Sequence, residues 1–393
     1  MSYNCKKCNY INFGKINKYM FLILLNALLY FILSITEDHS KFYAEKNLHP
    51  IIYNISSSLG SSLSFILYII YNIRNKTKIN IINNLPTNQN NINQINLKTK
   101  LLWILLVTIV SFIYHFIQSI MWFNLDNYLN IWAFYITFLS LFSYWILKMK
   151  LYKHHYVGII TVSIIGLLFN VITGKLSFDN IKKYYQFYLA SIFNVILQSL
   201  ILALYKYYMF VKYIKSYEIL FFGGLNELIL SIITLIITTN IGYIDNFWEF
   251  YENLDKKEII IFIFLTLINF FYNLLILIII DIFSPFYIFL ADFIAQNIFF
   301  FYKIDKLDLL TIIICVVSVL IEIFMILVFI EVIELNFCGF STMTKKNIES
   351  RAKLEVFEGD INNIILDKKI ILDEYELELI NDEGKDRSTA SNS

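Results

Sequence analysis

Ionisable side chains inside otherwise apolar segments are the residues of this chain best suited to do chemistry. They are three acids, Glu227, Asp292 and Glu322, and one histidine, His115. A charge at the centre of a bilayer costs about 2.5–3.5 kcal/mol on insertion scales, so each acid needs a partner or a role. Buried acids with a histidine can relay protons or bind a cation. We therefore expect the acids to shape a site or to couple it to protons.

Amide side chains inside the same segments could bind the polar groups of a solute. They are Gln118, Asn194, Gln198, Asn226, Asn269, Asn273 and Gln296. Several polar residues recur at a spacing of three or four, which places them on one face of a helix. The other interpretation is that they only join helices through hydrogen bonds, worth about 0.6 kcal/mol on average. We favour this second role for the amides and a functional role for the acids.

Membrane-spanning helices must position these residues. Hydrophobic residues make up 58% of the 393 residues, charged residues 16%, and the mean hydropathy is +0.61. Soluble domains are about 45–50% apolar and about 25% charged, so this chain lacks the polar surface of a soluble protein. A helix needs about 20 apolar residues to cross the hydrocarbon core. Ten runs come close to that length: Tyr19–Ile35, Ile51–Tyr71, Leu101–Trp122, Ile131–Leu147, Tyr156–Thr173, Phe187–Tyr208, Ile219–Thr239, Ile259–Ile280, Phe286–Phe301 and Leu309–Leu335. We predict an all-α integral membrane protein with about ten transmembrane helices.

The ends and connections of these runs predict the topology. Lysines precede the first run, as in a signal peptide, but no small-residue cleavage site follows it, so we expect a signal anchor. With the N-terminus in the cytosol, the cytosolic segments hold about twice as many Lys and Arg residues as the opposite loops. This bias places both termini in the cytosol. It fits a protein of the secretory pathway, another endomembrane or the plasma membrane.

Three segments lie outside the runs. Residues 1–18 form a predicted cytosolic N-terminal segment. Residues 75–96 are rich in Asn and are predicted to be a disordered loop. Residues 336–393 form a predicted cytosolic tail, in which the part from Glu349 carries about twice as many acids as bases. We expect this tail to be mostly a solvated arm.

An internal repeat relates the two halves of the chain. The segment Lys148–Gly158 and the helix after it can be laid on Lys303–Ile313, at an offset of 155 residues. In each half a helix ends in aromatic residues, a very short charged turn follows, and a long apolar helix begins. With ten spans these turns fall on opposite sides of the membrane. The pattern predicts two inverted five-helix repeats, residues 19–173 and 187–335, which is the layout of a secondary transporter with its site at the repeat interface.

A resemblance follows from the same segments. The stretch FLSLFSYWILKMKLYKHHYVGIITVSIIG, residues 138–166, resembles the passage from the fourth to the fifth helix in the drug/metabolite transporter superfamily, which includes EamA-type and nucleotide-sugar-transporter-like proteins. Ser284–Ile313 resembles the corresponding passage of the second half. That family often has a Glu in the second turn and a Gly in the last helix. Here Asp305 or Asp308 and the pair Ile313 and Ile321 stand there, so the second half departs from the pattern.

Several other classes are disfavoured. A net charge of +1 argues against a nucleic-acid partner. We find no HExxH, GxGD, Gly-framed Ser or nucleotide-binding lysine loop, and therefore expect no enzyme and no cofactor. Cys5 and Cys8 form half of a zinc knuckle without a second half, so no metal is expected there. The neighbouring His154 and His155 lie in a short turn, and we expect them at the membrane interface.

These observations predict a secondary transporter, not driven by ATP, that moves a small polar metabolite, for example a nucleotide sugar, by alternating access. Its partners would be the lipid bilayer and a small-molecule solute. The sequence does not decide between a monomer and a homodimer. The alternative is a multi-pass membrane scaffold or receptor that acts through its acidic C-terminal tail. A transporter concentrates polar residues at mid-depth on facing helices, and a scaffold need not.

Overall fold

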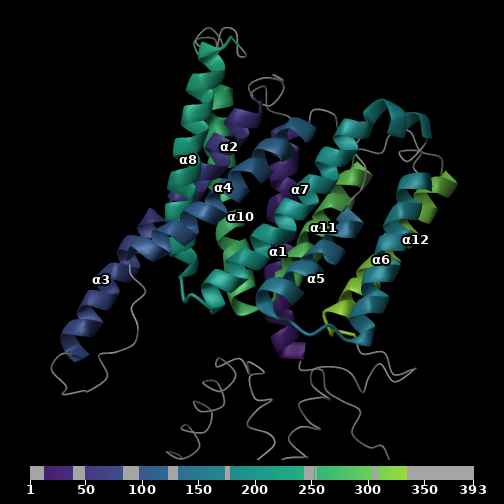
Figure 1. The fold of residues 1–393 in the computed structure, drawn as a ribbon, viewed down its shortest axis with the longest axis horizontal. Helices are drawn as coiled ribbons and strands as arrows, with labels where there is room; N and C mark the ends of the chain where they lie inside the picture. Colours follow the sequence, from purple (N-terminus) through teal and green to yellow (C-terminus); the bar gives the residue numbers. More distant parts are fainter. Residues whose placement is uncertain are drawn as a thin grey trace, which may run out of the picture. The chain divides into compact units, whose positions relative to one another are not determined.

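The described part of the chain is entirely helical in the computed structural model (Figure 1). The structure describes residues 13–38, 49–82, 97–122, 132–172, 178–242, 252, 255–302 and 309–333. The helices there are α1 (Phe13–Asp38), α2 (His49–Ser62), α3 (Phe65–Ile82), α4 (Leu97–Trp122), α5 (Trp132–Leu147), α6 (Lys153–Ile172), α7 (Phe178–Phe210), α8 (Ser216–Asn240), α10 (Lys256–Ile282), α11 (Pro285–Tyr302) and α12 (Leu309–Phe329). No strand occurs among these residues, so the predicted all-α class is confirmed for them.

Eight helices in this part are long and apolar enough to cross a membrane. They are α1, α4, α6, α7, α8, α10, α11 and α12. Many of their large apolar side chains face outward, for example Leu102 at 64% exposure and Ile260 at 66%. Exposed apolar surface on this scale is stable against lipid and not against water. The chain is a multi-pass integral membrane protein.

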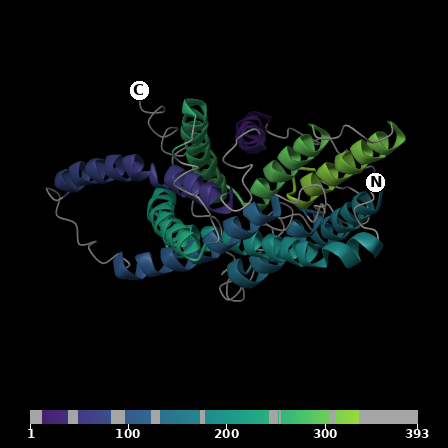
Figure 2. The same cartoon turned by 90° about the horizontal axis from the view of Figure 1, so that it is seen from above.

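The second predicted span differs from the structure because it is broken. Helix α2 ends at Ser62 and α3 begins at Phe65. The first turns of α3 pack against α8, and its later part extends away from the other helices (Figures 1 and 2). Serines cluster at the break, where the Ser62 hydroxyl donates to the carbonyl of Leu59 at 2.7 Å and the Ser64 hydroxyl to that of Ser61 at 2.7 Å. Such bonds compete with the helical ladder. Helix α2 has 14 residues, about 21 Å, which is less than the roughly 30 Å of the hydrocarbon core.

Other boundaries also differ from the predicted ones. Helix α5 has 16 residues, and its apolar part, Phe134–Leu147, is shorter than a usual span. The last predicted span runs to Leu335, but α12 ends at Phe329. Glu331 then adopts a left-handed φ of 61°, and the N–H groups of Val332 and Ile333 return to the carbonyl of Leu327. This geometry ends the helix.

Some predicted segments are changed or lie outside the described residues. Helix α1 already begins at Phe13, inside the predicted N-terminal segment, and α3 continues to Ile82, inside the predicted Asn-rich loop. The rest of both segments, the tail 336–393 and the turn with Asp305 and Asp308 lie outside the described residues. All the described helices belong to one structural unit, residues 1–333.

Helix packing centres on α2. This helix packs against α8, α10 and α4. On one side of this group, α1 packs against α10 and α11, and α5 packs against α7. Helix α6 packs against α5 and α12. Since α2 is too short to span alone yet contacts three long helices, it is an interior element of the bundle.

Close approach of helices depends on two glycines. A Cβ at Gly224 would lie 2.6 Å from the Cβ of Ser61 and 2.7 Å from the backbone N of Ser62. A Cβ at Gly60 would lie 2.6 Å from the carbonyl oxygen of Thr266. The sequence Gly223-Gly224 predicts such an approach, and for Gly224 the structure confirms it.

A matched pair of alanine substitutions tests this packing. Gly224→Ala is expected to destabilise the protein by about 1–3 kcal/mol, because the added methyl group meets the backbone of α2. Gly223→Ala is the control, since its Cβ would lie 3.5 Å from the Thr108 hydroxyl, an ordinary contact. Thermal unfolding in detergent measures both. Equal unfolding temperatures for the two variants would contradict the close approach.

Candidate functional site

A cavity lies among seven helices of the bundle, α1, α2, α4, α7, α8, α10 and α11. The cavity has a volume of about 90 Å³ and is partly open to the outside. Six of the predicted site residues line it: His115, Gln118, Gln198, Glu227, Asn273 and Asp292. The cavity is therefore where the structure brings most of the predicted chemistry together.

An acid and a histidine pair on one wall of the cavity. The Nδ1 atom of His115 on α4 lies 2.6 Å from Oε1 of Glu227 on α8. The two side chains are 17% and 7% exposed. The ring of Tyr53 meets the imidazole edge-on, with centroids 5.9 Å apart, and Tyr114 lies 5.0 Å from it. Aromatic rings thus lie beside a short contact between an acid and a histidine.

A second acid has only neutral partners. Asp292 on α11 is 1% exposed. Its Oδ1 accepts a bond of 3.1 Å from the Tyr272 hydroxyl, and its Oδ2 accepts one of 3.4 Å from the Gln198 amide. Among the residues that the structure describes, Asp292 takes part in no ion pair. The Tyr272 ring stacks on Tyr30 at 5.4 Å, so the residue that donates to this carboxylate belongs to a pair of stacked aromatic rings.

The amides divide between the cavity and the helix contacts. Asn273 lines the cavity and also donates to the hydroxyl of Ser61 on α2 at 2.9 Å. Asn269 donates to Ser56 at 3.5 Å, which again joins α10 to α2, and Gln296 donates to the Tyr30 hydroxyl. The residues that do not line the cavity are Asn194, Asn226, Asn269 and Gln296. For Asn269 and Gln296 the geometry is that of interhelical hydrogen bonding.

The third predicted acid is not in the cavity. Glu322 lies on α12, which packs mainly against α6, and it is 1% exposed. Within the described residues neither of its carboxylate oxygens has a hydrogen-bond partner. The structure therefore separates Glu322 from Glu227 and Asp292.

Replacing Glu322 is expected to stabilise the protein. Glu322→Leu removes a buried polar group without a partner, which costs about 1–3 kcal/mol in other proteins, and it keeps a similar volume. We expect a higher unfolding temperature in detergent. Glu322→Gln is the matched variant, because it keeps a polar group and should gain less. A lower stability for Glu322→Leu would mean that the carboxylate has an important partner.

Tyrosines are the residues that sequence reasoning missed. Five of them line the cavity: Tyr30, Tyr53, Tyr114, Tyr205 and Tyr272. The chain has 28 tyrosines, and nothing in their spacing separates these five from the others. Among the described residues that line the cavity there is no lysine and no arginine. The lining thus combines aromatic, amide and acidic residues with aliphatic ones.

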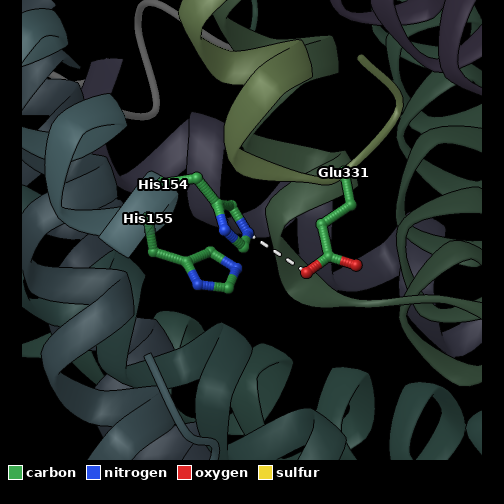
Figure 3. Close-up of side chains that lie close together, drawn as sticks. All are labelled: His154, His155 and Glu331. Atoms are coloured by element: carbon green, nitrogen blue, oxygen red, sulfur yellow. Dashed lines mark ion pairs between the residues drawn. The ribbon is translucent and has the colours of Figure 1, made fainter. Parts of the chain in front are cut away.

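A second cluster of ionisable residues joins the ends of α6 and α12 (Figure 3). Nε2 of His154 lies 3.1 Å from Oε1 of Glu331, and ligand atoms of both residues and His155 lie within 4.8 Å of one another. However, Nδ1 of His155 accepts the Tyr152 N–H at 2.8 Å, so its neutral ring carries the proton on Nε2. Only two ligand atoms remain, fewer than the three or four protein ligands of zinc sites. The contact between His154 and Glu331 therefore works as a link between two helix ends. His154 is 3% exposed, and the predicted position of both histidines at the membrane interface stays a prediction.

Fold and composition together define the class, a multi-pass integral membrane protein with a cavity of mixed polar and apolar lining inside the bundle. No protein-family model matches the chain, and no curated protein is significantly similar to it. The resemblance to the drug/metabolite transporter superfamily therefore stays a prediction. Any function has to be argued from the cavity itself.

Proposed function

We propose that the protein is a secondary transporter that moves a small polar solute by alternating access between two inverted five-helix repeats. The observation that carries the proposal is the cavity, whose lining comes from both predicted repeats. Helices α1, α2 and α4 contribute from the first, and α7, α8, α10 and α11 from the second. Inverted-repeat transporters bind their substrate at this interface. A scaffold that acts through its tail does not need polar residues gathered there.

The pattern of helix contacts supports the two repeats. Let α1, α2, α4, α5 and α6 correspond in order to α7, α8, α10, α11 and α12. Replacing each helix by its counterpart then turns one observed helix contact into another. Helix α5 packs on α7 as α11 packs on α1, α4 packs on α8 as α10 packs on α2, and α4 packs on α7 as α10 packs on α1. Helix α2 packs on its own counterpart α8, and α6 on its counterpart α12. A pseudo-two-fold relation produces such exchange.

Polar contacts follow the same exchange. His115 on α4 pairs with Glu227 on α8, and Asn273 on α10 pairs with Ser61 on α2. The match is incomplete, because α10 also packs against α7 and α11, while α4 has no contact of similar extent with α1 or α5. A difference of this kind is expected in a transporter, since its two repeats take different conformations in any state open to one side.

Contacts between helix ends support alternating passes of the chain. The pairs are Lys100 with Glu218, His154 with Glu331, and Lys206 with the carbonyl oxygen of Asp281. The paired atoms are 3.1 to 3.2 Å apart. If the chain crosses the membrane once for each of the ten predicted runs, all six of these helix ends lie on one side. The excess of Lys and Arg makes that side the cytosolic one, with both termini.

Uptake by proteoliposomes tests the proposal. The purified full-length protein would be screened with pooled amino acids, nucleotide sugars and organic cations, each with and without a pH gradient. We expect saturable uptake from one pool. If folded protein moves no solute from any pool, the transporter is ruled out and the scaffold acting through its tail takes its place.

A further inference from the structure

We infer that the transported solute is an organic cation, and that Asp292 holds its positive charge beside the rings of Tyr30 and Tyr272. This inference rests on the proposed transport function and names the chemical class of the solute. It follows from the charges and rings that line the cavity and from the partners that each of them already has.

The lining of the cavity holds more acidic than basic side chains. Its lining holds two carboxylates, one histidine and, among the described residues, no lysine or arginine. The histidine, His115, already contacts Glu227 at 2.6 Å. Asp292 accepts only from an amide and a hydroxyl. The Asp292 carboxyl therefore has no basic partner among the described residues, and a bound cation or a proton would compensate it.

An anionic solute fits this lining poorly. Proteins bind phosphate groups with arginine, lysine or the N–H groups of a helix N-terminus. The cavity lining offers no basic side chain other than His115, and the nearest acceptor of its Nδ1 atom is a carboxylate. Asp292 and Glu227 would repel a diphosphate. The lining thus disfavours a nucleotide sugar, which the sequence alone leaves open.

The aromatic residues complete a site for a cation. Tyr30 and Tyr272 are stacked at 5.4 Å with an angle of 29° between their planes, and the Tyr272 hydroxyl is 3.1 Å from Asp292. A cation that reaches Asp292 would come close to these rings. Cations bind tyrosine rings within about 6 Å of the centroid, and quaternary ammonium ligands are held in this way. A carboxylate beside tyrosines selects for positive charge and tolerates different shapes.

Ligand-induced stabilisation tests the inference without transport. Thermal unfolding of the full-length protein in detergent would be measured with choline and benzyltrimethylammonium. The comparison ligands are 3,3-dimethylbutanol, the neutral isostere of choline, and uridine diphosphate glucose, an anion. We expect at least one of the cations to raise the unfolding temperature in a concentration-dependent way, whereas neither comparison ligand does so at equal concentration. Stabilisation by the anion alone, or by no cation, would overturn the inference.

Variants assign the charge to Asp292. For Asp292→Asn we expect a cation Kd about 30-fold higher or more, because one partner of a buried charge pair is lost. Glu322→Gln is the matched control, a buried acid outside the cavity, and should bind as wild type does. If Asp292→Asn does not fold, Tyr30→Leu is the second test, with an expected rise of about 3- to 10-fold. Unchanged binding in the folded variant tested would assign the cation elsewhere.

The outcomes for the site and for transport can be told apart. Uptake of a neutral or anionic solute, without binding of either cation, would keep the transport function and overturn the cation site. Binding of a cation that depends on Asp292, without uptake of any solute, would keep the cation site and overturn transport.

Discussion

Proteoliposomes that hold Asp292→Asn are expected to take up the solute about 100-fold more slowly than wild type. Asp292 is 1% exposed, lines the cavity and has only neutral hydrogen-bond donors. Asparagine keeps its size and can keep the bond from Tyr272, so the variant removes charge and little else. Losing one partner of a buried charge pair costs about 2–5 kcal/mol, which corresponds to this change in rate or affinity. Initial uptake rates over a range of solute concentrations measure it.

The pH gradient gives this prediction a second measurement. If a proton and the solute bind to the Asp292 carboxylate in turn, uptake by wild type responds to the pH gradient. Residual uptake by Asp292→Asn then does not respond to it. Glu322→Gln is the control, because Glu322 is also buried in a spanning helix but lies outside the cavity. We expect this control to keep both the rate and the response to the gradient. Equal losses in the two variants would show that neutralising any buried acid impairs the bundle and would remove Asp292 from the site.

The elements of the fold were predictable from the sequence because the bilayer dictates them. A helix that pairs its own backbone groups must cross about 30 Å of hydrocarbon, so runs of about 20 apolar residues mark its position. The break between Ser62 and Phe65 escaped this rule, since leucine and isoleucine keep the run apolar there. Its local signal is the cluster of serines around Gly60, whose hydroxyls bond to nearby carbonyls.

The site was predictable only in part, because burial of charge is visible in a sequence and the choice of neighbours is not. Glu227, Asp292 and Glu322 look alike in the sequence, each an acid inside an apolar run. Packing places the first two in the cavity and the third on a helix that packs mainly against α6. The tyrosines carried no signal, since a tyrosine suits a membrane interface, a packed core or a binding site equally well.

Breaking the contact between His115 and Glu227 is expected to have the largest effect on stability. His115→Leu leaves the Glu227 carboxylate, whose side chain is 7% exposed, without its partner at 2.6 Å. Removing one member of a buried pair costs about 3–5 kcal/mol in other proteins. The double variant His115→Leu with Glu227→Leu removes both polar groups and is expected to recover much of this loss. Thermal unfolding in detergent of wild type, both single variants and the double variant gives the coupling free energy.

The counterpart contact between the two predicted repeats supplies the control for this cycle. Asn273 on α10 and Ser61 on α2 are joined by a hydrogen bond of 2.9 Å between neutral groups, and these helices correspond to the α4 and α8 that carry His115 and Glu227. Hydrogen bonds of this kind average about 0.6 kcal/mol in membrane proteins, so the coupling from Asn273→Ala and Ser61→Ala should be several-fold smaller. If the two couplings are equal, the acid and the histidine act only as an interhelical hydrogen bond. A large coupling confined to His115 and Glu227 would mean that the two corresponding contacts between the repeats differ in strength, so that α4 is held on α8 more firmly through this pair than α10 is held on α2.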